Sequence, residues 1–336
     1  MNVFITGGTG LVGRHVIAAL RAGPHTLRAL ARSDAAAAEL TALGAEPVRG
    51  DLSDAARLER LTAGSDAVVH AAAIVVAGGP WAAWHAANVL GTERVARAAA
   101  RNGARLVHLS SVAVYGRGGG GVDRPGRDET FDLARAPATR EPYARSKREA
   151  ELALWGVARE TGLVAVALRP CVLYGEGDRY FSPGIARVLR RGLVPLIGDG
   201  GNHPTLVYAG NVAAAVSAAL HHPDVSGPFN VTNDGRLTLR EFVARFAAGL
   251  GIPPRWIRIP RGLAWTAARA WDGTIGALVP SQAPSLTAAV QFLAGDNRYS
   301  SSRAEQVLGW RPAMSAAEAA ERTGASFRTA RPRPSP

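Results

Sequence analysis

Tyr143 and Lys147, four residues apart in the stretch YARSK, are the pair in this sequence best suited to acid–base chemistry. Lys147 is the only lysine in a chain with 39 lysines and arginines. Side chains at i and i+4 share one helix face, so these two can reach a common point. An ammonium beside a phenol lowers the pKa of the phenol, so Tyr143 could exchange a proton with a carbonyl or an alcohol. The compact, rotatable ammonium of lysine can also hold ribose hydroxyls, whereas the guanidinium of arginine is a broad planar group.

A glycine-rich turn lies near the start of the chain. The segment TGGTGLVG (6–13) follows the apolar run VFIT (3–6) and opens a helix, with glycines three residues apart. Such glycines permit a tight turn, close approach of the backbone to a pyrophosphate, and close packing of helix on strand. The N-terminus of the helix presents N–H groups to the anion. We therefore predict a dinucleotide site with contacts from Gly7, Thr9, Gly10, Leu11, Val12 and Gly13.

The residues after the second apolar run, TLRALA (26–31), bear on which dinucleotide binds. Arg32 can pair with a 2′-phosphate, so the sequence favours NADP, with NAD as the alternative. Asp34 could instead bind ribose, but Asp34 or Ser33 can equally cap the helix that follows. The choice of cofactor therefore depends mainly on Arg32.

Asp51 and Leu52, in the segment GDLSD (50–54), follow the third predicted strand and could line the adenine. Asp51 could alternatively cap the next helix, although Asp54 fits that role better. We therefore include Asp51 and Leu52 among the predicted cofactor contacts.

The segments that carry these residues alternate between short apolar runs and amphipathic, alanine-rich stretches. This alternation predicts a parallel sheet with helices on both faces, a Rossmann-type doubly wound α/β fold. Ligands of such sheets bind at the carboxyl ends of the strands, where the motifs fall. The predicted strands span 3–6, 26–31, 67–72, 106–110 and 164–169, and the predicted helices lie near 11–22, 54–63, 82–101 and 143–160.

The chain divides into two predicted parts at about Pro170. A dinucleotide-binding domain covers residues 1–170, and 205–235 return to it with a helix and a strand. A smaller, mostly helical substrate-binding lobe covers 171–204 and 236–325. We expect this lobe to shape the substrate pocket.

Two further segments are not expected to join a packed core. The stretch GRGGGG (116–121) has too few side chains to pack and is expected to be a mobile loop. Residues 326–336 are expected to form a basic, disordered tail.

Composition argues against several classes of protein. The net charge is +12, but the arginines are scattered along the chain, so no nucleic-acid partner is expected. A single cysteine, Cys171, allows no internal disulfide and no cluster of metal ligands, so no metal is expected. No apolar run reaches the roughly 18 residues of a membrane span, and the first residues read as a strand rather than a signal peptide. We expect a soluble, cytoplasmic protein without stable membrane insertion.

Together, these motifs resemble the extended short-chain dehydrogenase/reductase family over nearly the full chain. The resemblance rests on Gly-x-x-Gly-x-x-Gly, Tyr-x-x-x-Lys and LSSVAVYG (109–116). It implies that Ser111, rather than Ser110, hydrogen-bonds the reacting oxygen. It also implies that Asn88, in NVLGT (88–92), supports the site through water or the backbone of the lysine.

The resemblance assigns further positions around the cofactor. It places Ala71 and Ala72, in HAAA (70–73), against the cofactor, and Pro170 to Val172 beside the nicotinamide. The C-terminal stretch NRYSSSRAEQVLGWRP (297–312) is also similar to the family, although its apolar residues need be no more than core. Members commonly pair two helices across a dimer interface, so a homodimer is expected.

The position after the catalytic serine indicates the branch of the family. Dehydratases of sugar nucleotides carry an Asp-Glu pair there, whereas this chain has Val112 and Ala113. Epimerases usually have an asparagine where Val172 stands and an arginine near Pro204, so a diphosphate would find poor partners here. The segment TLVYAGNVAAAV (205–216) looks more like the 3β-hydroxysteroid dehydrogenase and dihydroflavonol reductase branches.

The expected function is that of an NAD(P)-dependent oxidoreductase that interconverts a secondary alcohol and a ketone on an apolar small molecule. Two alternatives remain: a sugar-nucleotide epimerase that uses the same residues, and a non-catalytic redox sensor that binds the dinucleotide. Regulators of the second kind tend to lose the tyrosine or the lysine, and this chain keeps both. Apolar residues of the lobe could line the pocket or form lobe core: Trp265, Trp271, Leu278, Val279 and Phe292.

Overall fold

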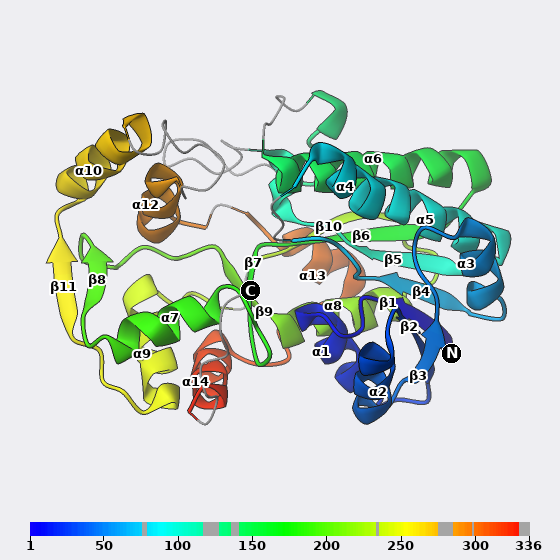
Figure 1. The fold of residues 1–336 in the computed structure, drawn as a ribbon, viewed down its shortest axis with the longest axis horizontal. Helices are drawn as coiled ribbons and strands as arrows, with labels where there is room; N and C mark the ends of the chain where they lie inside the picture. The colour runs from blue at the N-terminus through cyan, green and yellow to red at the C-terminus, as the bar shows by residue number, and fades with distance from the viewer. Residues whose placement is uncertain are drawn as a thin grey trace.

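A parallel sheet of seven strands forms the centre of the molecule, in the order β10-β6-β5-β4-β1-β2-β3 (Figure 1). This sheet and its flanking helices confirm the predicted Rossmann-type α/β fold. The computed structural model describes residues 1–75, 79–116, 128–135, 141–232, 235–274, 285–297 and 299–328. The strands are β1 (Asn2–Thr6), β2 (Thr26–Ala31), β3 (Glu46–Arg49), β4 (Ala67–His70), β5 (Arg105–Leu109), β6 (Ala165–Pro170) and β10 (Gly227–Val231).

Strands β4, β5 and β6 are buried along their whole length because helices cover both faces of the sheet. One face packs on α1 (Leu11–Leu20), α2 (Asp34–Leu43) and α8 (Ala209–His221). The other face packs on α3 (Ala55–Thr62), α5 (Gly91–Arg101) and α6 (Pro142–Thr161). The glycine turn therefore leads into a helix on one face, and Tyr143 and Lys147 lie on a helix of the other (Figure 1).

The predicted helix over 82–101 contains a local change of geometry. It begins as α4 (Trp81–Trp84), continues as the π-helical stretch η1 (His85–Leu90), and runs directly into α5. Short π-helical stretches often occur at functional sites. Here the stretch contains Asn88, one of the predicted site residues.

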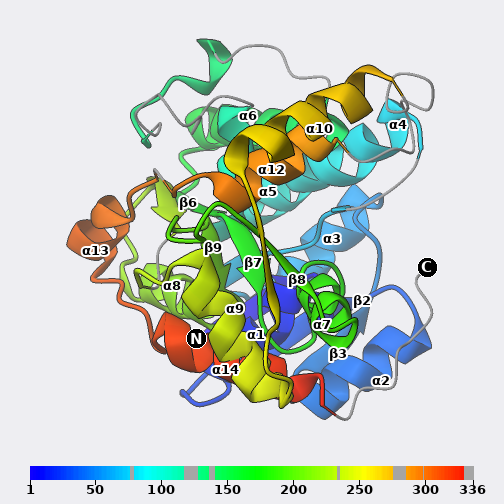
Figure 2. The ribbon, with the colours of Figure 1, turned by 90° about the vertical axis from the view of Figure 1, so that its left-hand side faces the viewer.

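The remaining elements form a second part beside the sheet, seen in front of it in Figure 2. Its apolar clusters lie among the helices and include Phe242, Phe246 and Val290. Two short parallel pairs, β7 with β9 and β8 with β11, add strands to a lobe predicted to be mostly helical. The elements are β7 (Val172–Tyr174), α7 (Ser182–Arg190), β8 (Val194–Ile197), β9 (Leu206–Tyr208), α9 (Leu239–Leu250), β11 (Trp256–Ile259), α10 (Arg261–Gly273), α12 (Leu286–Ala294) and α14 (Ala316–Ser326).

Trp265 and Phe292 are partly buried against these apolar clusters, so they contribute to lobe core. Trp271 is also half-buried, whereas Leu278 and Val279 lie outside the described residues. Trp265 and Phe292 are therefore better interpreted as part of the lobe core than as the lining of a substrate pocket.

One segment expected in the lobe packs elsewhere. The short helix α13 (Ser302–Leu308) and Trp310 contribute to the apolar core between the sheet and α8. The indole Nε1 of Trp310 donates to the carbonyl oxygen of Asn211 at 2.9 Å. The chain therefore returns to the sheet after the lobe, and residues 302–310 are better grouped with the predicted dinucleotide-binding domain.

The C-terminal tail begins later than expected. Ser326 is the last residue of α14, and Arg328 Nε donates to the carbonyl oxygen of Gly249 at 2.7 Å. The first residues of the tail therefore pack against the lobe. Residues 329–336, and residues 117–121 of the glycine-rich loop, lie outside the described residues.

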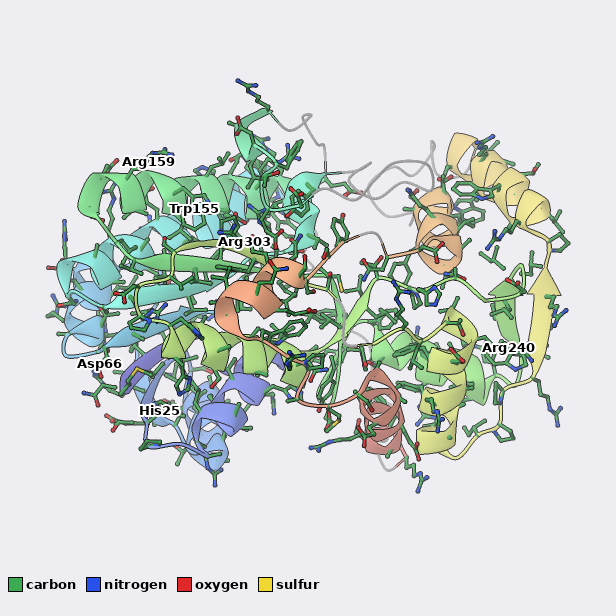
Figure 3. All side chains as sticks on the ribbon, turned by 180° about the vertical axis from the view of Figure 1, so that it is seen from behind. His25, Asp66, Trp155, Arg159, Arg240 and Arg303 are labelled. Atoms are coloured by element: carbon green, nitrogen blue, oxygen red, sulfur yellow. The ribbon has the colours of Figure 1, made fainter. Side chains whose placement is uncertain are left out.

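Arginines are spread over the surface of both parts. Arg159, Arg240 and Arg303 are exposed and come from α6, α9 and α13 (Figure 3). Within the described ranges, no helix combines the length and apolar character needed to cross a membrane.

Candidate active site

Tyr143, Lys147 and Ser111 come together at the carboxyl end of β5. Pro142 opens α6 at a position where its fixed φ suits a helix start, and Tyr143 follows it directly. Ser111 follows β5, caps the 3₁₀ turn η2 (Val112–Tyr115) and lies close enough to the phenol of Tyr143 to lower its pKa. Lys147 Nζ donates to the carbonyl oxygen of Leu109 at 2.7 Å. The structure thus places a hydroxyl, a phenol and a buried ammonium next to one another.

The pKa of Tyr143 differs from the expectation. Burial raises the pKa of this phenol above its usual value of 10, and the hydrogen bond with Ser111 lowers it by less. The ring of Trp84 packs edge-on against Tyr143, with centroids 6.4 Å apart, and helps to exclude water. The predicted lowering by the ammonium of Lys147 is therefore wrong for the protein alone, because desolvation outweighs the favourable contacts.

Lys147 is 5% exposed, and this burial lowers its pKa from 10.5 to about 8. The carboxylate of Glu151 acts in the opposite direction and raises the pKa. Lys147 is therefore mostly charged at neutral pH and loses its charge as the pH rises through about 8. The pKa of the only lysine in the chain therefore lies near neutral pH, where a change in its charge can serve proton transfer.

Asn88 connects the π-helical stretch to α6. Its Nδ2 donates to Ser146 Oγ at 2.9 Å and to the carbonyl oxygen of Ile74 at 3.0 Å. Its Oδ1 accepts the backbone N–H of Ile74 at 2.8 Å. Ser146 Oγ in turn donates to the carbonyl oxygen of Tyr143 at 2.9 Å. Asn88 therefore reaches the first turn of α6 through the side chain of Ser146.

Ser110 is occupied in another contact. Its hydroxyl donates to Glu151 Oε2 at 2.5 Å, and both groups are buried. Ser111 is therefore the serine that faces Tyr143, as the sequence interpretation preferred.

The glycine turn leaves no room for side chains. Gly7 has a φ of +74°, and a Cβ there would lie 2.5 Å from the backbone nitrogen of Ala72. A Cβ at Gly13 would lie 2.1 Å from the carbonyl oxygen of Gly7. Gly10 begins α1, and no side chain caps the helix. The uncapped N-terminus of α1 presents backbone N–H groups, and the glycines let a ligand come close to the backbone. This arrangement fits the pyrophosphate of a dinucleotide.

The other predicted residues of this turn have different surroundings. Thr9 and Leu11 are half-buried at the start of α1. Val12 points into the apolar core with 8% exposure, so only its backbone could contact a cofactor. The glycine turn thus offers a cofactor mainly backbone groups.

Arg32 follows β2 directly and is exposed. Ser33 is the residue that caps α2, since its side chain accepts the N–H of Ala36 at 3.2 Å, and Asp34 lies in the first turn. Asp34 pairs with Arg49 at 3.5 Å. Arg32 is therefore available for a ligand at the end of the second strand, as required of a 2′-phosphate partner.

Asp51 lies close enough to Arg32 to interact with it electrostatically. Hydrogen bonds from Ser53 lower the pKa of Asp51, and the charges of Arg32 and Arg94 add to this. Asp54, not Asp51, caps α3 by accepting the N–H of Arg57 at 2.9 Å. Leu52 is half-buried and packs against the helix-covered face of the sheet. Asp51 and Arg32 thus share the adenosine end of the expected site.

Ala71 and Ala72 lie beside the glycine turn, as expected. The N–H of Ala71 donates to the carbonyl oxygen of Thr6 at 3.0 Å, and that of Ala72 donates to Thr6 Oγ1 at 3.4 Å. Pro170 ends β6 and is buried, whereas Val172 begins β7 and is 37% exposed. Val172 therefore offers an apolar surface at the edge where the strands end.

A buried polar row beneath α5 and α6 was not predicted. Thr6, His70 and His108 are register neighbours on β1, β4 and β5. His70 Nδ1 lies 2.6 Å from Thr6 Oγ1, and its Nε2 lies 3.1 Å from Thr92 Oγ1. The two imidazoles stack with centroids 5.2 Å apart. The signal in the sequence was a polar residue near the end of each of these apolar strands.

Both histidines of this row are neutral at physiological pH. Burial, with a smaller effect of the Lys147 charge, lowers the pKa of His70 from 6.5 to about 3. The same causes lower the pKa of His108 well below its usual value, and neither ring nitrogen of His108 has a hydrogen-bond partner. The ammonium of Lys147 therefore sits above uncharged imidazoles.

Ser111, Tyr143 and Lys147 together can exchange a proton with an oxygen atom held next to Ser111 and Tyr143. β1 and β5 are separated only by β4, and their carboxyl ends lie at the same edge of the sheet. With strands about 4.8 Å apart, the glycine turn and Ser111 lie on the order of 10 Å from each other. A dinucleotide on the turn could therefore extend its nicotinamide end to the hydroxyl pair.

Comparisons with known proteins identify a matching family and similar sequences. Residues 3–233 match the model of the NAD dependent epimerase/dehydratase family. The chain is 34% identical over 316 residues to a 4-hydroxy-2-methyl-3-oxo-4-farnesyl-3,4-dihydroquinoline-1-oxide ketoreductase of Stigmatella aurantiaca, with 92% of each chain covered. It is 33% identical to a 2-alkyl-3-oxoalkanoate reductase of Stenotrophomonas maltophilia, covering 75% of this chain and 77% of that protein.

A solved structure supports the fold. UDP-N-acetylglucosamine 4-epimerase from Bacillus cereus superposes with a TM-score of 0.71 over 98% of this chain and 99% of that one. The sequences are 22% identical, so this likeness shows a shared architecture and does not specify the reaction.

Proposed function

Because this chain belongs to the NAD dependent epimerase/dehydratase family of extended short-chain dehydrogenases/reductases, we propose that it is an NADP-dependent ketoreductase for an apolar small molecule. The observation that carries the proposal is the placement of Ser111 close to the phenol of Tyr143, one helical turn from the buried ammonium of Lys147. The reaction would interconvert a ketone and a secondary alcohol. The named relatives include a ketoreductase and a 3-oxoalkanoate reductase, in keeping with this chemistry.

Each side chain has a distinct role in this proposal. Ser111 orients the substrate oxygen by hydrogen bonding, and Tyr143 donates a proton to that oxygen in the reducing direction. Lys147 keeps a positive charge near the phenol and so favours release of its proton. Asn88 holds the first turn of α6 through Ser146. When bound, the nicotinamide would supply the hydride.

The residues around the hydroxyl pair suit an apolar substrate. Val112 and Ala113 stand where a dehydratase would need acidic groups, and Val172 exposes an apolar side chain at the strand ends. Trp84 adds an aromatic wall against Tyr143. A nearby cavity of about 420 Å³ is more polar, with Glu141, Asp272 and Thr287 in its wall.

The alternatives receive less support. A sugar-nucleotide epimerase would need polar anchors for a diphosphate, and the position corresponding to its usual asparagine is Val172. A redox sensor would not need the buried lysine beside a phenol. Two further expectations stay proposals: a homodimer, and a cytoplasmic location in keeping with a single cysteine, Cys171, which is buried.

A substrate panel tests the function. Purified protein with NADPH should reduce a 2-alkyl-3-oxoalkanoate or a 3-ketosteroid, followed by the loss of NADPH absorbance, and should leave UDP-glucose unchanged. Epimerisation of UDP-glucose without net oxidation of NADPH would contradict the proposal. Turnover of neither class, together with binding of NADPH, would favour the sensor.

Arg32→Ala tests the choice of cofactor. Loss of a charged contact to the 2′-phosphate should weaken NADPH binding roughly ten- to a hundredfold and leave NADH binding nearly unchanged. Fluorescence titration of both cofactors measures the effect. Arg60→Ala, an exposed arginine on α3, removes the same charge elsewhere and should change neither affinity. Equal affinities for NADPH in Arg32→Ala and the parent protein would remove Arg32 from the site.

A further inference from the structure

We propose that Glu151 is a positioning residue of the active site, which holds Lys147 in its charged form and anchors the turn that carries Ser111. The proposal rests on the roles proposed above for Lys147 and Ser111. Glu151 lies one helical turn beyond Lys147 on α6 and is completely buried. A fully buried carboxylate is costly unless it is paired and hydrogen-bonded, so the contacts of Glu151 need an explanation.

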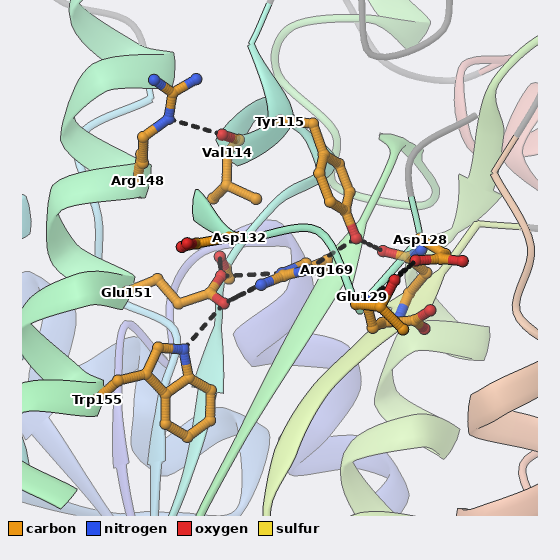
Figure 4. A network of polar contacts seen from close by, with 12 residues as sticks. Val114, Tyr115, Asp128, Glu129, Asp132, Arg148, Glu151, Trp155 and Arg169 are labelled. Atoms are coloured by element: carbon orange, nitrogen blue, oxygen red, sulfur yellow. Dashed lines mark hydrogen bonds and ion pairs between the residues drawn. The ribbon is translucent and has the colours of Figure 1, made fainter. Parts of the chain in front are cut away.

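The carboxylate of Glu151 is held by three side chains, two of which, Arg169 and Trp155, are labelled in Figure 4. Arg169 Nη2 lies 2.5 Å from Oε1, and Arg169 Nε lies 3.1 Å from both carboxylate oxygens. Trp155 Nε1 donates to Oε1 at 3.2 Å. Ser110 Oγ donates to Oε2 at 2.5 Å. These contacts come from α6, β6 and the end of β5, so the carboxylate has one fixed position.

Arg169 is itself held on its other side. Its Nη1 donates to the hydroxyl oxygen of Tyr115 at 2.8 Å, and that hydroxyl donates to Asn230 Oδ1 at 2.8 Å. The backbone N–H of Asn230 donates to Glu129 Oε1 at 2.7 Å. The guanidinium is 2% exposed and cannot turn away from Glu151 without breaking this chain of bonds. The ion pair is therefore a rigid support.

The first consequence is geometric. Ser110 directly precedes Ser111, and its N–H donates to the carbonyl oxygen of Leu168 at 2.8 Å. The bond from Ser110 Oγ to Glu151 adds a second anchor from α6. Since Tyr143 and Glu151 belong to the same helix, this anchor sets the distance between the Ser111 turn and the helix that carries the phenol. Glu151 thus acts on the substrate oxygen through Ser111 and does not touch it.

The second consequence is electrostatic. The titratable and charged groups around Lys147 are Tyr143 and Glu151 on α6, His70 on β4, His108 on β5 and Arg169 on β6. The two histidines are uncharged at neutral pH, and Tyr143 is protonated there. Among the described residues, Glu151 is the carboxylate that favours the ammonium against desolvation. Without it, Lys147 should lose its proton at a lower pH.

The single lysine makes this directly measurable. Protein grown with lysine labelled with carbon-13 at Cε gives one lysine side-chain resonance, whose shift follows the protonation of Lys147. The parent protein should titrate at about pH 8. In Glu151→Gln the midpoint should fall by about one pH unit, the lower end of the effect of a nearby opposite charge. The measurement needs neither substrate nor cofactor.

Glu149→Gln is the matched control. Glu149 lies on the same helix, is partly exposed and pairs with Arg145. Its removal takes away the same charge and should leave the midpoint unchanged. An equal shift in both variants, or no shift in Glu151→Gln, would overturn the electrostatic part of the proposal.

Glu151→Gln leaves Arg169 without a charged partner and could prevent folding. The double variant Glu151→Gln with Arg169→Met removes both charges and should fold, as judged by circular dichroism. Its midpoint should also lie below that of the parent protein, but by less than in Glu151→Gln, because the positive charge of Arg169 is removed as well. A midpoint of about 8 in the folded double variant would contradict the proposal.

The pH profile of turnover provides a second readout. Activity that needs charged Lys147 falls as the pH rises through the pKa of Lys147, and this fall forms the alkaline limb of the pH profile. The alkaline limb should therefore move to lower pH in Glu151→Gln. If the parent protein reduces no ketone but the lysine midpoint still shifts, the proposed function fails and the electrostatic role of Glu151 stands. If turnover is present and neither the midpoint nor the limb moves, only the role of Glu151 fails.

Discussion

Tyr143→Phe should lower kcat by roughly 10²–10⁴-fold, because the variant has no proton to give to the substrate oxygen. Cofactor binding should remain, since the glycine turn and Arg32 are separate from the phenol. The ring should still pack against Trp84, whose centroid lies 6.4 Å away, so the fold should be kept. Steady-state reduction of a ketone measures kcat, and fluorescence titration with NADPH measures binding.

Tyr180→Phe is the control for this prediction. Tyr180 is 59% exposed and lies in the loop before α7, so loss of its hydroxyl should leave kcat unchanged. Turnover within a few-fold of the parent protein in Tyr143→Phe would refute the assignment of the proton donor. Loss of NADPH binding in the same variant would instead mean that the phenol has a structural role in the cofactor site.

Gly13→Ala should abolish detectable NADPH binding and destabilise the protein. The added Cβ would lie 2.1 Å from the carbonyl oxygen of Gly7 and 2.7 Å from Cα of Gly8. Since both neighbours are backbone atoms, the glycine turn must move away from α1. Such overpacking costs about 1–3 kcal/mol, and the displaced turn no longer presents its N–H groups to the pyrophosphate. Chemical denaturation and NADPH titration measure the two effects.

Gly156→Ala is the matched control, because Gly156 lies inside α6 and an added Cβ meets nothing within 4 Å. This substitution should stabilise the protein by about 0.5–1 kcal/mol, since alanine favours the helix more than glycine does. It should leave NADPH affinity unchanged. Normal affinity in Gly13→Ala would show that the turn does not bind the dinucleotide.

Features of the site with a local pattern could be predicted from the sequence. The glycine turn is a contiguous segment, and Tyr143 and Lys147 are one helical turn apart, so spacing alone relates their positions. The alternation of apolar runs and helices likewise predicted the parallel sheet. The capping residue Ser33 was one of two candidates, because both it and Asp34 lie at the start of the helix with suitable side chains.

Features that depend on register and burial could not be predicted. Glu151 and Arg169 meet only because β6 returns beneath α6, and Thr6, His70 and His108 are aligned by three separate strand pairings. The direction of the Tyr143 pKa shift was wrong because it depends on desolvation. Sequence spacing identifies a neighbouring charge but does not measure how much water a side chain loses.

The packing of Trp310 has a consequence for protein synthesis. Its indole fills the core between the sheet and α8, and it bonds to Asn211. A nascent chain that has emerged only through the first two hundred residues or so therefore lacks part of the hydrophobic interior of its own first half. The ribosome must release the chain to beyond Trp310 before that half can reach its final form.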